Sequence, residues 1–180
     1  MTIAYLPCML AATLLVACGS DRAEPVSQAP GASAPSEAGS PHTRTWSGAG
    51  LAALDAYERT ARELAAGIEA RRDVDILVAT GEVLMAEGMI LVPEFTSRHP
   101  HCAAYLEAAS AVRKTWRELD HDTIERDYHE DGALQRPDNA AACYHMKDLV
   151  VHPATALVLL TQDEPDFEAA KREIDEVLAH

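Results

Sequence analysis

The sequence predicts an all-α fold: a helical bundle of four main helices with short extra helical segments. Three observations support this prediction. Hydrophobic residues make up 48% of the 180-residue chain, which is enough for a packed core. Ala and Leu, which favour helices, are abundant, while the chain has only two Phe and two Trp. Apolar residues also recur at steps of three and four, which places them on one face of a helix.

The first two helices are expected over residues 51–68 and 74–92. The first carries one apolar stripe, formed by Leu51, Leu54, Tyr57, Ala61, Leu64 and Ile68. The second is apolar on most sides, as is typical of a central core helix, and is expected to stop at Pro93. Gly81 and Gly88 lie seven residues apart in it. We expect them to let a neighbouring helix approach closely.

The third helix is expected to begin near Pro100, because proline is favoured in a first helical turn. Its apolar stripe continues to about residue 119. Beyond this point two interpretations are open: Asp120 or Asp122 caps a fourth segment, or the same helix continues to Glu130. Gly132 is a suitable C-terminal stop for either.

Two more helices are expected in the last third of the chain. Pro137 and Asp138 open one of them, with Asp138 as its N-cap, and Pro153 kinks or splits it. Pro165 opens the last helix, whose inward residues are Phe167, Ala170, Ile174 and Leu178. Short loops join these elements, as in a helix bundle.

Charge and missing motifs exclude several classes of function. The formal net charge is −14, and residues 1–17 contribute none of it. Nucleic acid is therefore not an expected partner, because phosphate binding needs a basic face. The sequence contains no C-x-x-C-H haem motif, no G-x-S-x-G nucleophile elbow and no phosphate loop. An enzyme in which a bound metal ion keeps one coordination position open for water is one option for the function. No substrate is indicated, so we lean against an enzymatic role.

The N-terminal segment has the features of an export signal. An apolar run over residues 3–17 is too short to span a bilayer, and it ends in Leu15-Val16-Ala17-Cys18. A segment rich in Pro, Ala, Ser and Gly follows. This arrangement resembles the lipobox of bacterial lipoproteins. An ordinary signal peptide with an incidental cysteine is the alternative.

The lipoprotein resemblance implies a domain organisation and a location. Residues 1–17 would be removed as the signal peptide, and Cys18 would become a lipid-bearing N-terminus that anchors the chain in a membrane. Residues 18–45 would form a flexible linker, and residues 46–180 the helical domain. Gly19 follows the cysteine in place of Asp, which by the sorting rule of these lipoproteins favours the outer membrane, facing the periplasm.

The four cysteines can be assigned within this organisation. Cys8 would leave with the signal and Cys18 would take the lipid, so Cys102 and Cys143 remain. We expect these two to form a disulfide, because the implied compartment is oxidising. Two thiolates that bind a soft metal are the alternative, which the absence of C-x-x-C spacing makes weaker.

Two expected helices each present two histidines and a carboxylate on one face. The first set has the spacing i, i+4, i+8, and the second i, i+3, i+7. The six residues are His121, Glu125, His129, His145, Asp148 and His152. If the helices face each other in the bundle, these side chains form a pocket of nitrogen and oxygen ligands, which suits zinc, iron, nickel or copper(II).

Other interpretations of these histidines remain open. They can be incidental, hydrogen-bonded to Tyr128, Tyr144 or nearby acids. The chain would then be a structural or interaction lipoprotein with an envelope protein as its partner. Glu82 is a further candidate ligand, because it lies in the nearly all-apolar second helix. His99 and His101 flank Pro100 and can join a site, although polar residues at a helix start are more often solvated.

Overall fold

The computed structural model describes residues 46–138 and 140–179. All of them belong to one compact unit, Gly39–His180. The described residues form helices and no strand, which confirms the all-α prediction. The expected signal segment 1–17, the lipid-bearing Cys18 and the linker 18–45 lie outside the described residues, so they stay predictions.

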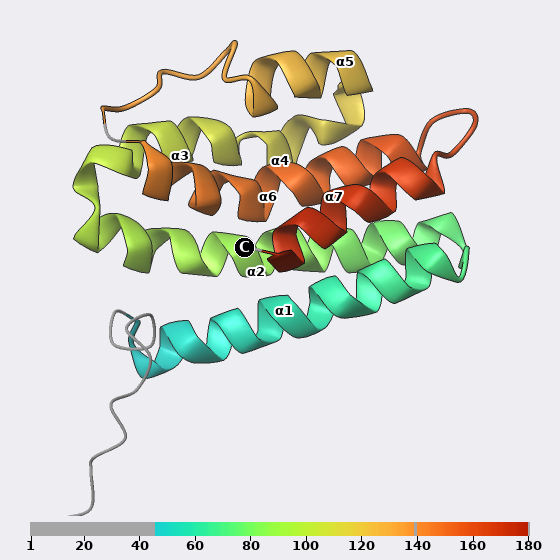
Figure 1. The fold of residues 1–180 in the computed structure, drawn as a ribbon, viewed down its shortest axis with the longest axis horizontal. Helices are drawn as coiled ribbons and strands as arrows, with labels where there is room; N and C mark the ends of the chain where they lie inside the picture. Colours follow the sequence, from blue (N-terminus) through green and yellow to red (C-terminus); the bar gives the residue numbers. More distant parts are fainter. Residues whose placement is uncertain (1–45, 139, 180) are drawn as a thin grey trace, which may run out of the picture. The chain divides into compact units, whose positions relative to one another are not determined.

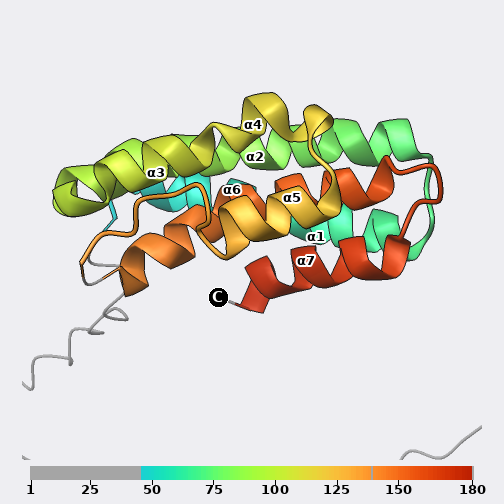
Figure 2. The same cartoon turned by 90° about the horizontal axis from the view of Figure 1, so that it is seen from above.

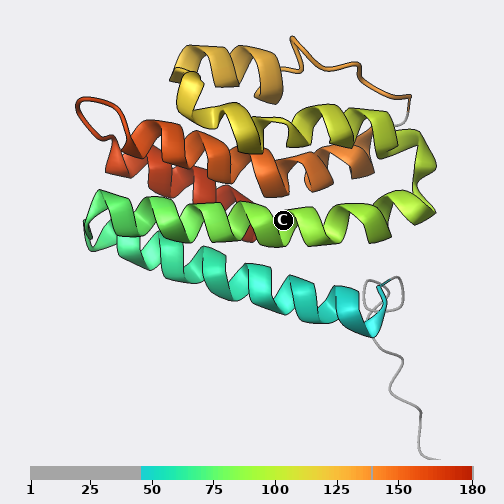
Figure 3. The ribbon, with the colours of Figure 1, turned by 180° about the vertical axis from the view of Figure 1, so that it is seen from behind.

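Four helices form the bundle: α1 (Gly48–Glu69), α2 (Val74–Arg98), α6 (Ala141–Leu160) and α7 (Phe167–Ala179). Helix α1 packs against α2 and α7, and α6 packs against the same two helices. The opposite views of Figures 1 and 3 show α1 and α2 as a long neighbouring pair, with α6 and α7 beside them.

The segment between α2 and α6 is a series of short helical pieces in place of one long third helix. It comprises η1 (Pro100–Cys102), α3 (Ala103–Ser110), α4 (Val112–Thr115), η2 (Trp116–Glu118), α5 (His121–Ile124) and the π-helical turn η3 (Glu125–His129). Asp120 is the N-cap of α5, since its Oδ1 accepts a hydrogen bond of 2.7 Å from the Thr123 amide. Helix α5 contacts α6, and Figure 1 shows it above α3 and α4, at the opposite edge of the domain from α1. Figure 2 gives the view from above, with α5 in front of α6.

Helix α6 is the central element of the bundle. It contacts α2, α7, α3, α4 and α5, and every residue over 150–160 is buried. Gly81 and Gly88 of α2 face it: a Cβ on Gly81 would lie 2.6 Å from a methyl of Leu157, and one on Gly88 2.8 Å from the carbonyl oxygen of Leu149. This confirms the expectation that the two glycines permit close approach.

Two helices of the bundle continue through a proline, and for α2 this differs from the stop that the sequence predicts at Pro93. Helix α2 continues through Pro93 to Arg98, and α6 continues through Pro153. Each proline removes one backbone hydrogen bond, but packing outweighs the loss. The whole stretch around Pro153 is buried, and beside Pro93 the side chains of Val92 and Phe95 are buried. Asp138 is not an N-cap, because α6 begins later, at Ala141 after the cap residue Ala140.

The predicted disulfide is present. Cys102 and Cys143 are bonded with their Cα atoms 5.5 Å apart, and the bond closes a loop of sequence separation 41. Both sulfurs lie in a hydrophobic cluster that includes Leu106 and Met146. On the chain-entropy model a loop of this length stabilises the fold by about 4 kcal/mol.

One face of α2 stays exposed. Ile76, Val83 and Ile90 lie on it, with 46%, 51% and 63% of their surface accessible. The helix is long and apolar enough to span a membrane, with a mean hydropathy of 1.7 in its best window. However, Leu77 and Leu84 on its other face are 1% exposed or less. A core helix of a soluble bundle passes the same test of length and composition.

We predict that Gly88→Ala destabilises the domain more than Gly81→Ala. The added methyl at position 88 meets a backbone carbonyl, which cannot move without displacing α6, whereas at position 81 it meets the end of the Leu157 side chain. We expect a loss of about 1–3 kcal/mol for Gly88→Ala, as in overpacked cores. Urea unfolding measures both values, and an equal or larger loss for Gly81→Ala would contradict this packing argument.

Candidate metal centre

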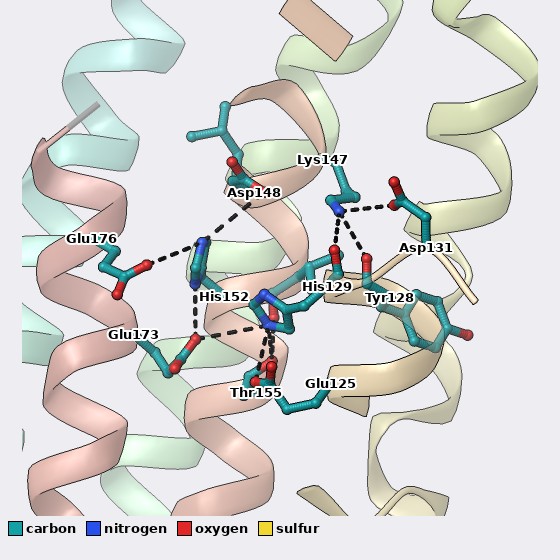
Figure 4. A network of polar contacts seen from close by, with 12 residues as sticks. Glu125, Tyr128, His129, Asp131, Lys147, Asp148, His152, Thr155, Glu173 and Glu176 are labelled. Carbon is teal, nitrogen blue, oxygen red and sulfur yellow. Dashed lines mark hydrogen bonds and ion pairs between the residues drawn. The ribbon is translucent and has the colours of Figure 1, made fainter. Parts of the chain in front are cut away.

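Polar side chains from three elements meet inside the bundle (Figure 4). His129 comes from the end of η3, His152 from α6 and Glu173 from α7. One ligand atom from each of the three lies within 4.8 Å of the other two. His152 is buried, and the other two residues are partly buried. The three form a group of two imidazoles and one carboxylate.

Glu173 is the carboxylate that links the two histidines. Its Oε2 lies 2.8 Å from Nδ1 of His152 and 3.8 Å from Nε2 of His129. The two imidazole rings meet edge to face with centroids 4.8 Å apart. On the other side of His129, Glu125 Oε1 lies 3.8 Å from the same Nε2. His129 Nε2 is therefore close to two carboxylates from different elements.

The π-helical turn η3 places Glu125 and His129. The Glu130 amide donates to the Glu125 carbonyl at 2.9 Å, an i→i+5 bond that widens the turn by one residue. Glu125 and His129 are the two ends of this turn. His121, one turn earlier, has its Nε2 3.6 Å from Glu125 Oε1. Single π-turns inside helical segments occur frequently at functional sites.

The second nitrogen of His152 also faces carboxylates. Its Nε2 lies 4.0 Å from Asp148 Oδ1 and 3.8 Å from Glu176 Oε2. Histidines that bind metals through one nitrogen commonly direct the other toward a carboxylate, which orients the ring and makes the ligand more basic. Asp148 and Glu176 are in position for this role when Nδ1 is the ligand atom.

Thr155 determines the proton position on His129. The Thr155 hydroxyl donates to the Val151 carbonyl at 3.0 Å, so it accepts at 2.8 Å from His129 Nε2. This pattern assigns the ring proton to Nε2. An ion at Nε2 would have to displace that proton.

Burial and charge shift the pKa values of the group in opposite directions. Burial lowers the pKa of His129 to about 4, and the positive charge of His152 adds to this effect. Burial alone would lower the pKa of His152, but its hydrogen bond to Glu173 and the charge of that carboxylate raise it overall. Burial and the charge of Glu173 raise the pKa of Glu125. At neutral pH His129 is thus an uncharged imidazole between carboxylates that repel each other.

A buried lysine fixes the backbone of His129. Lys147 Nζ donates to the carbonyls of Tyr128 and His129 at 2.8 and 3.1 Å, and to Asp131 Oδ1 at 2.9 Å. Asp131 also accepts from Tyr105 Oη at 2.7 Å. Burial alone would raise the pKa of Asp131, but the hydrogen bonds from Lys147 and Tyr105 lower it. Asp131 therefore stays ionised, and Lys147 connects the end of η3 to α6.

The structure brings together part of the predicted ligand set. His129 and His152 belong to the group, Glu125 lies beside His129, and His121 and Asp148 lie at its edge. Glu82 lies elsewhere, 2.6 Å from Arg117 in an exposed ion pair.

His145 lies outside the group. It is exposed and precedes His152 by seven residues, about 10 Å along α6. Helix α7 runs antiparallel to α6 and faces His152 with Glu173 and Glu176. His145 and His152 both follow the helical spacing of the predicted set, but only His152 is buried and belongs to the group.

Glu173 was missed by sequence reasoning. It lies in the segment 171–176, in which every residue except Ile174 is charged, a composition typical of a solvated helix face. A weak signal exists nevertheless. Glu173 lies three residues after Ala170 and four before Val177, both of which are buried, so it shares the inward stripe of α7.

Comparison with known proteins gives no match: no family model fits the chain, and neither curated proteins nor solved structures resemble it. The roles of the site residues must therefore be argued from the geometry of this chain.

We predict that Lys147→Met destabilises the domain by about 3 kcal/mol, because it leaves the carboxylate of Asp131 buried without its main partner. Arg136→Met is the control. Arg136 contacts the same carboxylate at 3.0 Å but is 60% exposed, so its loss should change stability by less than about 1 kcal/mol. Urea unfolding measures both, and similar losses would contradict the central role of Lys147.

We also predict that His129 makes stability depend on pH between about 4 and 6.5. Its folded pKa lies below the unfolded value, so the unfolded chain binds the proton more tightly and stability falls as the pH drops through this window. In metal-free buffer, the wild type should lose up to roughly 3 kcal/mol more than His129→Gln across it. His152 acts in the opposite direction, above pH 6.5, because its folded pKa is raised. Identical profiles for wild type and variant below pH 6.5 would contradict this prediction.

Proposed function

We propose that the chain is a membrane-anchored envelope lipoprotein whose helical domain binds a divalent transition metal ion. The observation that carries metal binding is the meeting of His129, His152 and Glu173 inside the bundle. The first two are the nitrogen ligands and Glu173 is the oxygen ligand. Glu125, whose Oε1 lies 3.8 Å from the same Nε2 of His129 that Glu173 approaches, is the fourth candidate.

The distances support an ion at this point. Nitrogen and carboxylate ligands lie about 2.1 Å from zinc, so two ligands of one ion are at most about 4.2 Å apart. Glu173 Oε2 satisfies this limit with both histidines, at 2.8 and 3.8 Å. The remaining pair, His129 with His152, lies within 4.8 Å. A small side-chain movement is enough to bring all three onto one ion.

The charges also favour a cation. Four carboxylates, from Glu125, Asp148, Glu173 and Glu176, surround the two imidazoles. The nearest buried lysine, Lys147, is already paired with Asp131. A divalent ion would neutralise the repulsion between Glu125 and Glu173. It would also meet His129 as a neutral imidazole, because the pKa of this residue is about 4, and binding at Nε2 would require only that the ring proton move to Nδ1.

The donor set defines the class of metal. Two imidazoles with one or two carboxylates suit zinc, iron(II), nickel or copper(II), and disfavour the hard ions calcium and magnesium. His152, whose pKa is raised, would release its extra proton when the ion binds. Two histidines and one carboxylate leave positions for water on the ion. We make no proposal of a reaction, because no substrate is indicated.

The envelope location has separate support. The segment Leu15-Val16-Ala17-Cys18 resembles a lipobox, and the Cys102–Cys143 disulfide fits an oxidising compartment. We propose that lipid on Cys18 anchors the domain to the outer membrane, facing the periplasm. The acidic chain is not suited to bind anionic headgroups directly, so the lipid would provide the attachment.

Metal content of the purified full chain tests the proposal. We expect elemental analysis to find close to one transition metal ion per chain after incubation with zinc, iron(II), nickel or copper(II) and desalting. The double variant His129→Ala, His152→Ala should lose the ion, because it removes both nitrogen ligands. Bound metal should also raise the melting temperature of the wild type, and chelation should reverse the increase.

His145→Ala is the matched control for this experiment. It removes an imidazole from the same helix as His152 but outside the group, and it should retain the metal. A wild-type protein that stays folded and metal-free with all four ions would refute metal binding. That result would favour the alternative of a structural or interaction lipoprotein with incidental histidines.

A further inference from the structure

A second group of metal-ligating side chains lies near the start of α6. His101 Nε2 is 3.5 Å from Cys102 Sγ, and the ligand atoms of His101, Cys102 and Cys143 all lie within 4.8 Å of one another. Cys143 and His152 are nine residues apart, about 13 Å along the helix. This second group is therefore separate from the centre at His129 and does not depend on it.

The two sulfurs are not ligands while they are bonded to each other. A dithiol reductant would change this: its two thiols become a disulfide, the Cys102–Cys143 bond breaks, and each sulfur takes one electron and one proton. A metal ion that then binds both sulfurs displaces those two protons. Reduction thus converts a covalent link between η1 and α6 into two soft ligands beside an imidazole.

The backbone around both cysteines favours the thiolate form. Cys102 is the N-cap residue of the eight-residue α3, and Cys143 is the third residue of the twenty-residue α6. The partial positive charge of a helix N-terminus stabilises an adjacent thiolate. Two helix starts therefore point toward the same pair of sulfurs.

The surroundings favour a neutralised site over two free thiolates. Cys102 and Cys143 are fully buried in an apolar cluster that includes Leu91, Leu106 and Met146. Apolar surroundings oppose free negative charge. A bound copper(I) ion lowers the net charge of the two thiolates from −2 to −1, so the occupied site is easier to bury than two free thiolates. His101 is exposed, so the imidazole forms the side of the group from which an ion can enter.

We propose that the reduced protein binds copper(I) through Cys102, Cys143 and His101. Thiolates are soft ligands and select copper(I) or zinc among the biological metals. A structural zinc site takes four ligands, whereas this group supplies three within the described residues. The disulfide and the metal are then alternative occupants of the same two sulfurs. The reduction state of the pair decides which is present.

The test uses the full chain with Cys8→Ser and Cys18→Ser, so that only the described pair can supply thiols. The protein is prepared oxidised or reduced with a phosphine, and copper(I) is titrated against a chromophoric competitor. We expect one ion per reduced chain and none per oxidised chain. Cys102→Ser with Cys143→Ser should abolish binding in both preparations.

His101→Gln distinguishes this site from any exposed dithiol. It keeps both cysteines and should weaken copper(I) binding by about tenfold or more, as loss of even an outer partner does at other metal sites. His152→Gln is the control and should leave the copper(I) affinity unchanged. Equal affinity for His101→Gln and its parent, equal binding to the oxidised chain, or loss of helical circular dichroism on reduction would each overturn the proposal.

Discussion

The burial of α6 is the constraint on which the rest of the structure depends. Every residue over 150–160 is buried, so any polar group in this stretch must find its partner inside the protein. His152 and Thr155 are the two strongly polar residues there. Their partners come from neighbouring elements: Glu173 from α7 and His129 from η3. The same burial explains why α2 presents Gly81 and Gly88 to α6.

Local spacing of residues and the expected oxidising compartment account for the predictions that the structure confirms. The stripe of α1, the closeness of Gly81 and Gly88 to a neighbour, and the disulfide all follow from local spacing or from the expected compartment. The incorrect prediction of where α2 ends has a different cause. Helix α2 does not stop at Pro93, since Leu91, Val92 and Phe95 beside it pack in the core, which outweighs one lost hydrogen bond. Packing of this kind depends on contacts between distant segments, which no local pattern contains.

The candidate site was predictable only in part, for a related reason. His129 and His152 share an inward face with their neighbours and were found by spacing. His145 has equally good spacing but is exposed and outside the group. Glu173 lies in a mostly charged segment, yet it contacts His152. The outcome at both positions depends on which residues of α7 pack against α6. That pairing is decided by contacts between helices and by the loop that joins them, and no local spacing in the sequence contains it.

The disulfide also limits how far the segment that carries part of the candidate site can move away from α6. The covalent loop between Cys102 and Cys143 encloses α5 and η3, and so carries Glu125 and His129, while His152 lies outside it. Short segments such as these have low local stability and open without unfolding the whole domain. When this segment moves away, the crosslink limits its distance from α6 and keeps the effective concentration of His129 near its partners high. If the site holds the proposed ion, such local opening on a short covalent tether would let the ion exchange while the four-helix bundle stays intact.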